Sequence, residues 1–335
     1  MPVAPVPIRR IVISVSIGKA GHIPRAANRK SGNLLLAREM IEKTLAEMAV
    51  ALEQSPDYRI MRRLVPRVEY AVPDGRATKI GLLLDVETTG LDPARDEIIE
   101  LGMVKFEYVP DGRITRVTDT FSCFNEPSGR IPEEITNPTG ITDELVRGHK
   151  LDEHFVQEFA SDSVVVIAHN AAFDRKFVER YCDAFQNKFW ACSASEIEWR
   201  NHGFQGSRLS YLLMGAGFFH QPHRAVDDCR ALLEILAMPL PGTGTIALAA
   251  LLERARRKTV RIWAEQSPFE LKDELKRRGY RWSDGSDGRP KSWYIEVEER
   301  LQAEEIEFLR KTIYLRDVDP SVQILSARDR FSVRV

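Results

Sequence analysis

The alternation of apolar and polar positions divides the middle of the chain into strands and helices. Residues 80 to 84, IGLLL, are continuously apolar, which is typical of a strand buried on both faces of a mostly parallel sheet. Further strands are predicted at ELGMVKFEYV (100–109), ITRVTDTFSCF (114–124) and SVVVIAH (163–169), and helical stretches after residues 171, 193, 208 and 225. The pattern predicts an α/β domain with a mixed sheet over residues 78–240, opening with an antiparallel meander.

Helical patterns also flank this domain. Apolar residues recur at steps of 3, 4 or 7 between Leu34 and Leu52, so residues 34–77 are expected to form a helical extension whose apolar stripe needs a packing partner. A Pro/Gly cluster, PLPGTGT (239–245), indicates a domain boundary. Beyond it, the strand patterns TVRIWA and SWYIEV enclose a helix that a capping box starts at Ser267, which predicts a small α+β module over residues 255–335.

Composition restricts the class of protein. A length of 335 residues with 43% hydrophobic residues allows about two globular domains. The four cysteines lack C-x-x-C spacing, which indicates a reducing compartment, and no apolar run approaches the roughly 20 residues of a membrane helix. We therefore expect a cytoplasmic protein. Residues 1–33 are basic and rich in proline, typical of a flexible tail or of a wrongly assigned start.

Net charge constrains any role in nucleic-acid binding. The formal net charge is −1. A partner nucleic acid would thus have to be held by a local basic surface or through metal ions.

Two carboxylates stand at the end of the apolar strand, in DVETTGL. Asp85 and Glu87 are two residues apart, so their side chains share one face of the strand. Two such anions at the edge of a core repel each other unless one is protonated or a cation lies between them. A solvated strand end, with Thr88 and Thr89 making the turn, is the alternative interpretation.

A second acidic position follows the strand SVVVIAH. His169 and Asn170 end that strand, and Asp174 lies in the first turn of the next helix. Helix capping by Asn170 and a favourable helix dipole at Asp174 would explain this pattern without any function.

A third acidic position lies in HQPHRAVDDCRALLEIL. Asp227 and Asp228 occupy the first turn of a helix, and Asp228 shares a face with Leu232 and Ile235. Asp228 therefore leans toward the core and needs a partner, whereas Asp227 is assigned to solvent. His223, five residues earlier, can overhang the same place, while the other histidines, His220 included, are given no role.

Four carboxylates at strand ends and helix starts of one domain suit a metal centre. Asp85, Glu87, Asp174 and Asp228 could hold two Mg²⁺ or Mn²⁺ ions about 3.5–4 Å apart, because these ions prefer hard oxygen ligands. His223 is of the right type to deprotonate an attacking water near neutral pH.

These motifs carry a resemblance to a known family. DVETTGL, HNAAFD and HRAVDD, in this order, resemble the three motifs of the DEDDh 3'–5' exonucleases, the DnaQ-like group that includes the proofreading epsilon subunit of bacterial DNA polymerase III. The resemblance covers about residues 78–238. It implies a ribonuclease H-like fold, four metal-binding acids (Asp85, Glu87, Asp174, Asp228) with two Mg²⁺ or Mn²⁺ ions, and His223 as general base. It further implies that substrate is bound by Thr88, Thr89, Leu91, Asn170 and Phe173.

The resemblance implies removal of nucleoside monophosphates from 3' ends of DNA, in repair or accessory proofreading with a DNA polymerase or repair protein as possible partner. No clamp-binding peptide is apparent after residue 240, and nothing there resembles the polymerase-binding tail of epsilon. A 3'–5' exoribonuclease and a non-catalytic nucleic-acid-binding module are the alternatives. The tryptophans and tyrosines of the C-terminal module form either its core or, with Arg277, Arg278 and the basic linker at 254–258, a platform for single-stranded bases.

Overall fold

The computed structural model describes residues 30–286 and 288–335, which fall into two compact units with a division between Ile60 and Met61. The first unit contains the long helix α1, Lys30–Glu53. Leu45 and Met48 of the predicted apolar stripe are about half exposed, at 48% and 56%. Most of the predicted basic tail, residues 1–29, lies outside the described residues.

The predicted helical extension is shorter than expected. Residues 54–77 contain no helix, since prolines at 56, 66 and 73 interrupt this stretch and a proline cannot continue a helix ladder. The second unit begins here, with β1, Arg62–Arg63, pairing in parallel with β7, Phe218–Phe219.

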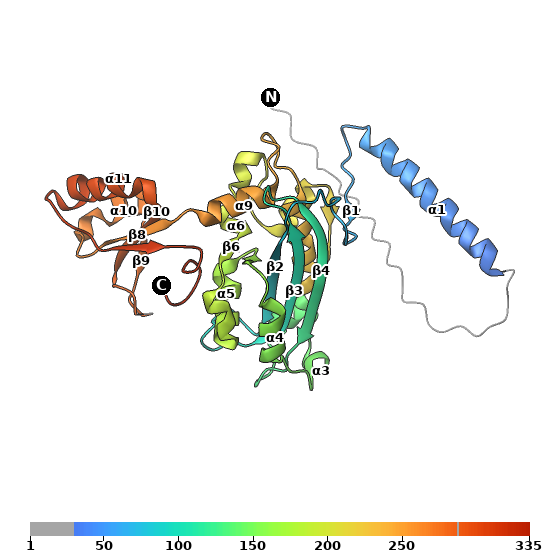
Figure 1. The fold of residues 1–335 in the computed structure, drawn as a ribbon, viewed down its shortest axis with the longest axis horizontal. Coiled ribbons are helices and arrows are strands. Elements are labelled where there is room, and N and C mark those ends of the chain that lie inside the picture. The colour runs from blue at the N-terminus through green and yellow to red at the C-terminus, as the bar shows by residue number, and fades with distance from the viewer. Residues whose placement is uncertain (1–29, 287) are drawn as a thin grey trace, which may run out of the picture. The chain divides into compact units, whose positions relative to one another are not determined.

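A five-stranded mixed sheet forms the centre of the second unit (Figure 1). Its order is β4-β3-β2-β5-β6, in which β2, β3 and β4 are antiparallel and β5 and β6 run parallel to β2. The strands confirm the predicted meander. The predicted buried strand is β2, which lies at the centre of the sheet. Their bounds are β2 Lys79–Thr88, β3 Ile98–Tyr108, β4 Ile114–Phe124, β5 Val165–Ala168 and β6 Trp190–Cys192.

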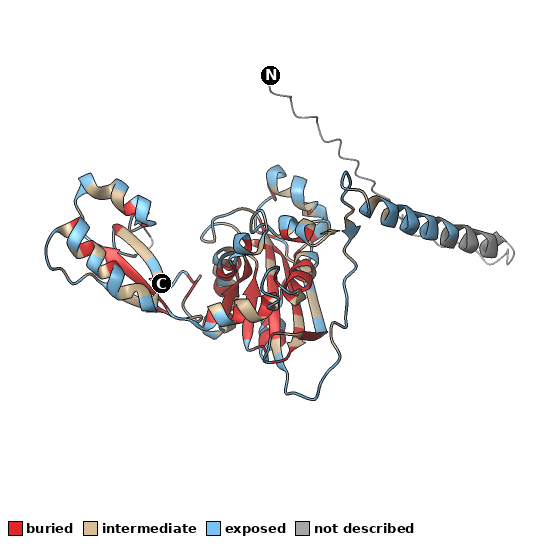
Figure 2. Ribbon diagram, turned by 90° about the horizontal axis from the view of Figure 1, so that it is seen from above, coloured by how far each residue is buried: buried red, intermediate tan, exposed pale blue. Residues whose placement is uncertain are grey.

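Helices cover both faces of this sheet, and buried residues concentrate in the sheet and on the inner sides of the helices (Figure 2). One face packs on α7 (Leu209–Gly215), α8 (Ala225–Ala237) and α9 (Ala247–Arg256). The other packs on α4 (Glu153–Ala160), α5 (Ala171–Tyr181) and the 3₁₀ helix η1 (Asp183–Asn187). Shorter elements are α2 Glu133–Thr139, α3 Asp143–Val146, α6 Ser193–Glu196 and η2 Trp199–His202.

The alternation along β2 decides where the acids point. Leu82 and Leu84 belong to the core beneath α5, whereas Leu83 belongs to the core beneath α8. Since side chains alternate along a strand, Asp85 and Glu87 continue on the α8 side. The strand thus delivers both carboxylates toward the start of α8.

The C-terminal module is a four-stranded antiparallel sheet of order β11-β8-β10-β9, with helices on one face. The predicted capping box is wrong: Pro268 precedes a 3₁₀ turn that makes no side-chain cap, and the α-helix starts only at Lys272. Bounds are β8 Thr259–Ala264, η3 Phe269–Leu271, α10 Lys272–Arg278, β9 Arg281–Ser283, β10 Ser292–Glu298, η4 Glu299–Leu301, α11 Gln302–Phe308, the π-helical η5 Leu309–Tyr314 and β11 Val322–Leu325.

The aromatic residues of this module differ in their burial. Trp263 and Tyr280 are 4% exposed, whereas Trp282 on the edge strand β9 is 50% exposed. In the basic linker, Arg257 forms ion pairs with Glu253 and Glu298.

The module is tied back to the central sheet at both of its ends. The helix α9, beyond the predicted boundary at 240, buries Leu248 and Leu251 in the core beneath α8. At the other end, the C-terminal tail, residues 326–334, reaches the edge strand, where Trp190 N–H donates to the carbonyl of Ala327 (2.8 Å). The exonuclease-like domain predicted over 78–240 is therefore completed by segments that follow it in sequence.

The tail is held by an internal arginine. Arg175 of α5 is fully buried and donates to the carbonyls of Arg328 (2.7 Å) and Arg330 (2.6 Å) while pairing with Glu179 (2.7 Å). Each of the three nitrogens of this guanidinium thus donates to a protein oxygen, as burial of a charge requires.

All four cysteines are free thiols. Within residues 30–286 and 288–335, no helix combines the length and the apolar character needed to cross a membrane.

Candidate active site

Three of the predicted acids converge at the end of β2. One carboxylate oxygen from each of Asp85, Glu87 and Asp228 lies within 4.8 Å of the other two. The first two come from the strand and the third from the first turn of α8. Such a cluster of oxygen donors is the coordination chemistry that Mg²⁺ or Mn²⁺ prefers, and these residues could hold a metal.

Asp174 reaches the same place from the opposite side of the sheet. It lies in the first turn of α5, is only 3% exposed, and its Oδ1 accepts a hydrogen bond from Val86 N–H (3.1 Å). This bond fastens the start of α5 to β2 between the two strand carboxylates. Asp174 is the strongest charged influence on Asp85.

Crowding and burial shift the proton affinities of these acids. Desolvation, followed by the charges of Asp174 and Asp228, raises the pKa of Asp85 well above its usual range. Desolvation and then Asp228 raise the pKa of Glu87 to about 8. Burial raises the pKa of Asp174 to about 7, although the hydrogen bond from Val86 opposes the shift. Uncompensated carboxylates of this kind favour binding of cations.

His223 stands exposed in the loop that leads into α8. Its φ is +66°, in the left-handed region, where a residue other than glycine costs about 1–3 kcal/mol. The strain is held by Asp228, whose Oδ2 accepts hydrogen bonds from the backbone N–H groups of His223 (2.8 Å) and Arg224 (3.3 Å). Asp228 therefore shapes the loop as well as contributing to the acidic cluster.

His220, to which the sequence assigned no role, also contacts this cluster. Its Nε2 lies 2.6 Å from Asp228 Oδ1, and its side chain is 8% exposed. No pattern in the sequence before α8 predicts this contact, because the contact depends on how the loop folds back.

An ion pair between the loop and β3, with only its carboxylate buried, was not predicted from the sequence. Arg224 donates two hydrogen bonds to Glu100 of β3, at 3.1 and 3.2 Å, and Glu100 is 1% exposed. In sequence, Glu100 is simply one polar residue in an apolar strand. Only the pairing of β3 beside β2, with Glu100 opposite Glu87, places it near the site.

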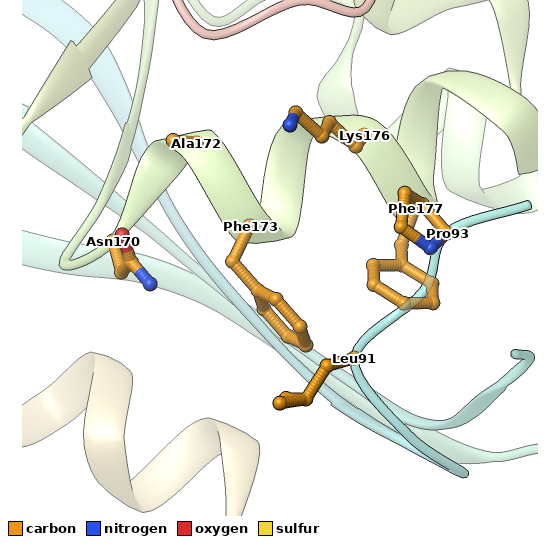
Figure 3. Close-up of a pocket in the computed structure, with 7 residues that line it drawn as sticks. All are labelled: Leu91, Pro93, Asn170, Ala172, Phe173, Lys176 and Phe177. Carbon is orange, nitrogen blue, oxygen red and sulfur yellow. The ribbon is translucent and has the colours of Figure 1, made fainter. Parts of the chain in front are cut away.

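A shallow cavity of about 200 Å³ lies beside the start of α5 (Figure 3). Leu91, 82% exposed, approaches the ring of Phe173, which packs on Phe177 with a centroid distance of 4.9 Å. Three of the residues predicted to bind substrate therefore line one surface, Leu91, Asn170 and Phe173. The cavity is completed by Pro93, Ala172, Lys176 and Phe177, none of which was predicted from sequence.

The two threonines predicted to bind substrate do not line this cavity. Thr88 is buried and its hydroxyl donates to the carbonyl of Gly90 (2.6 Å), while the Thr89 hydroxyl accepts from Glu97 N–H (3.0 Å). Both side chains shape the loop that presents Leu91.

His169 is held in place by hydrogen bonds on both ring nitrogens. Its Nδ1 lies 2.8 Å from the Ser193 hydroxyl and its Nε2 lies 2.6 Å from the carbonyl of Ser207. Burial lowers its pKa. With both nitrogens hydrogen-bonded, the ring connects the end of β5 to Ser193 and Ser207.

Comparison with known proteins agrees with the fold and the motifs. Residues 82–236 match the RNase T family model, described as "Exonuclease". This part of the chain is similar to that exonuclease family, and its mixed sheet flanked by helices confirms the expected α/β fold.

The similar curated proteins are long replication enzymes. PolC-type DNA polymerase III of Thermotoga petrophila is 29% identical over 198 residues, which are 56% of this chain and 14% of the relative. That of Caldanaerobacter subterraneus is 30% identical over 220 residues, 61% of this chain and 15% of the relative. The chain thus spans under a sixth of the length of these relatives.

Among solved structures, an E. coli ExoI–ssDNA complex with bound zinc aligns with a TM-score of 0.44 at 14% identity, covering 66% of this chain and 63% of that one. A similarity at this level adds nothing to the argument for the site.

Proposed function

We propose that this protein is a metal-dependent 3'–5' exonuclease that releases nucleoside monophosphates from 3' ends of DNA. The observation that carries the proposal is the convergence of Asp85, Glu87 and Asp228 within 4.8 Å of one another. Asp174 completes the set of acids, and the match of residues 82–236 to an exonuclease family model supports the reaction class. Similarity to PolC-type polymerases supports DNA as substrate and a cytoplasmic role in replication or repair, beside a polymerase or repair protein.

The four acids would hold two divalent ions, Mg²⁺ or Mn²⁺. When bound, such ions supply a polarised phosphate, an activated water and a stabilised leaving oxygen. The raised pKa values of Glu87 and Asp174 fit this role, because a cation removes the repulsion that burial creates.

The chain's own residues would orient the substrate and move the proton. The terminal nucleoside would lie against Leu91 and Phe173, with Asn170 at the edge of the cavity. His223, exposed in the loop beside Asp228, would take the proton from the attacking water. We assign the 3' end to this cavity because the motifs DVETTGL, HNAAFD and HRAVDD resemble those of 3'–5' exonucleases.

Digestion of labelled oligonucleotides tests the reaction and its polarity. With Mg²⁺, single-stranded DNA labelled at its 3' end should release labelled mononucleotide at once, whereas 5'-labelled DNA should give a ladder of shortening products. EDTA and the variant Asp85→Asn should both abolish hydrolysis. Immediate release of a 5'-terminal label would contradict the proposed polarity, and preferential digestion of RNA would favour the exoribonuclease alternative.

His223 is tested separately. His223→Ala should lower kcat by about 10²- to 10⁴-fold at neutral pH while leaving metal affinity nearly unchanged. A loss of Mn²⁺ binding in calorimetry would instead make His223 a metal ligand.

A further inference from the structure

The position of the His223 ring depends on the backbone conformation of this residue. Within the described part of the chain the imidazole makes no hydrogen bond, and the residue is exposed. Its backbone is in a strained left-handed conformation at φ +66°. Something must hold that conformation, because the unconstrained loop would relax toward negative φ.

The loop is fastened on both sides of His223. On one side, the backbone N–H of His223 donates to Asp228 Oδ2 (2.8 Å). On the other, the guanidinium of Arg224 is fixed by two hydrogen bonds to Glu100, and Glu100 Oε2 also accepts from the N–H of Ala225 (3.3 Å).

The rotamer of Arg224 is fixed as well. Its guanidinium lies over the ring of Phe124, 5.1 Å from the centroid. A planar group held by two parallel hydrogen bonds and an aromatic face keeps one orientation, which lysine could not reproduce. Residue 224 is thus tied to β3 and β4.

Glu100 could instead be read as a fifth metal ligand. Its hydrogen bonds argue against that reading, since Arg224 and Ala225 occupy Oε2 and Arg224 occupies Oε1. The pair is also neutral as a whole, so it adds little to the net charge of the acidic cluster. Its contribution is geometric.

We infer that Glu100 and Arg224 are positioning residues, whose bidentate pair holds the loop that presents His223 to the attacking water. The inference rests on the proposed function, in which His223 is the general base. Neither residue lines the cavity proposed for the terminal nucleoside.

Substitutions at both residues, alone and combined with His223→Ala, test this role. Arg224→Met and Glu100→Gln should each lower kcat by about 10- to 100-fold, as expected for a misplaced catalytic group, with KM changed by less than about threefold. Mn²⁺ affinity, measured by calorimetry, should stay within about threefold, because the metal-binding acids remain. In the His223→Ala background, the same substitutions should change the residual rate by less than about threefold, since their effect passes through His223.

The structure offers a matched control on the same helix. Arg67 forms a second bidentate pair with Glu234 of α8, at 2.6 and 3.1 Å, far along the helix from His223. Arg67→Met should lower stability yet leave kcat within about twofold of wild type. If Arg224→Met fails to fold, Arg224→Lys keeps the charge but loses the fork, and should show a smaller loss of kcat of the same kind.

Three results would overturn the inference. Equal losses with and without His223 would show a general structural role, and a tenfold or larger loss of Mn²⁺ affinity would show action through Asp228. Wild-type kcat in Arg224→Met and Glu100→Gln, with His223→Ala impaired, would remove the positioning role while leaving the proposed function intact. Wild-type kcat in His223→Ala itself would instead refute the proposed base.

Discussion

Gly102 faces Ala225 so closely that no side chain fits between them. A β-carbon on Gly102 would lie 2.5 Å from the carbonyl carbon of Ala225 and 2.5 Å from the amide nitrogen of Val226. Gly102 pairs with Asp85 across β2 and β3. The missing side chain is therefore what allows the first turn of α8, with Asp228, to lie beside the strand carboxylates.

Gly102→Ala should push α8 away from the sheet. Because the obstructing atoms belong to the backbone, we expect a loss of about 1–3 kcal/mol in the free energy of unfolding and a marked loss of Mn²⁺ affinity. Urea denaturation and calorimetry measure the two effects. Gly129→Ala is the control, since a β-carbon there meets nothing within 4 Å. Wild-type metal affinity in Gly102→Ala would show that α8 adjusts without moving Asp228.

Asp85→Asn should separate activity from stability. Asp85 lies at the centre of a crowded group of anions, and burial with the charges of Asp174 and Asp228 raises its pKa. Removing the ionisable group should abolish hydrolysis while raising the melting temperature of the metal-free protein at alkaline pH, because a buried carboxyl beside other anions no longer has to ionise. Activity assays and thermal melts in EDTA measure the two effects. Retained hydrolysis in pure protein would remove Asp85 from the site.

The metal-free protein should lose stability as pH rises from 5 to about 8.5. The folded pKa values of Glu87 and Asp174, about 8 and about 7, exceed their ordinary values of 4.5 and 3.8. The folded state thus binds these protons more tightly than the unfolded state, so the stability they contribute is complete below about pH 4 and is lost through pH 7 to 8.

Saturating Mg²⁺ should flatten this dependence, because cations replace the protons. Thermal melts across this pH range, with and without EDTA, measure both curves. Glu87→Gln should reduce the slope in EDTA. A melting temperature that rises with pH in EDTA would contradict the assigned shifts.

Much of this site follows from local patterns in the sequence. The β2 strand and the face shared by Asp85 and Glu87 come from a run of apolar residues and a period of two, both local properties. The first helical turns that carry Asp174 and Asp228 can likewise be predicted, because the apolar pattern changes there to a helical period. The contacts of His220 and Glu100 could not be predicted, because each joins segments that only loop folding or strand pairing brings together.

The C-terminal tail is the clearest limit of sequence reasoning. Arg175 looks like an ordinary polar residue on a helix, yet it is fully buried, because the carbonyls of Arg328 and Arg330 complete its hydrogen bonds. Backbone carbonyls carry no side-chain signature. The Pro/Gly cluster at 239–245 therefore predicted a domain boundary. In the structure, α9 and the tail follow this cluster in sequence but contact the domain that precedes it.

Deletion of residues 327–335 should destabilise the domain built on the central sheet. The cut removes two carbonyl acceptors of the buried Arg175 guanidinium, and an incompletely paired buried charge costs about 3–5 kcal/mol. Urea denaturation measures the loss. Adding Arg175→Met together with Glu179→Leu to the truncated chain should recover part of it, since this removes the buried ion pair whose partners in the tail are lost. Unchanged unfolding of the truncated chain would show that the tail is dispensable.

The last prediction concerns Trp282, through which we propose that the C-terminal module contacts single-stranded nucleic acid. Trp282 is 50% exposed, and its ring packs edge-on against Trp293 at 5.4 Å, so it presents a fixed apolar surface. Lys291 is also exposed on this module. Bases stack on such a ring with about 1–3 kcal/mol each, while lysine side chains contact phosphates.

Trp282→Ala should raise KM by about 5- to 100-fold and leave kcat unchanged, because stacking far from the reacting atoms stabilises ground and transition states equally. Lys291→Ala should reduce the slope of log affinity against log salt by about 1, because one phosphate contact is lost. Steady-state kinetics on single-stranded DNA at several salt concentrations measure both effects. Phe155→Ala is the control, since it removes an aromatic ring of similar exposure, 49%, to which no role is assigned. If both variants keep the wild-type KM and salt slope, the module does not bind nucleic acid through this surface, and a protein-binding role becomes the better explanation for its exposed tryptophan.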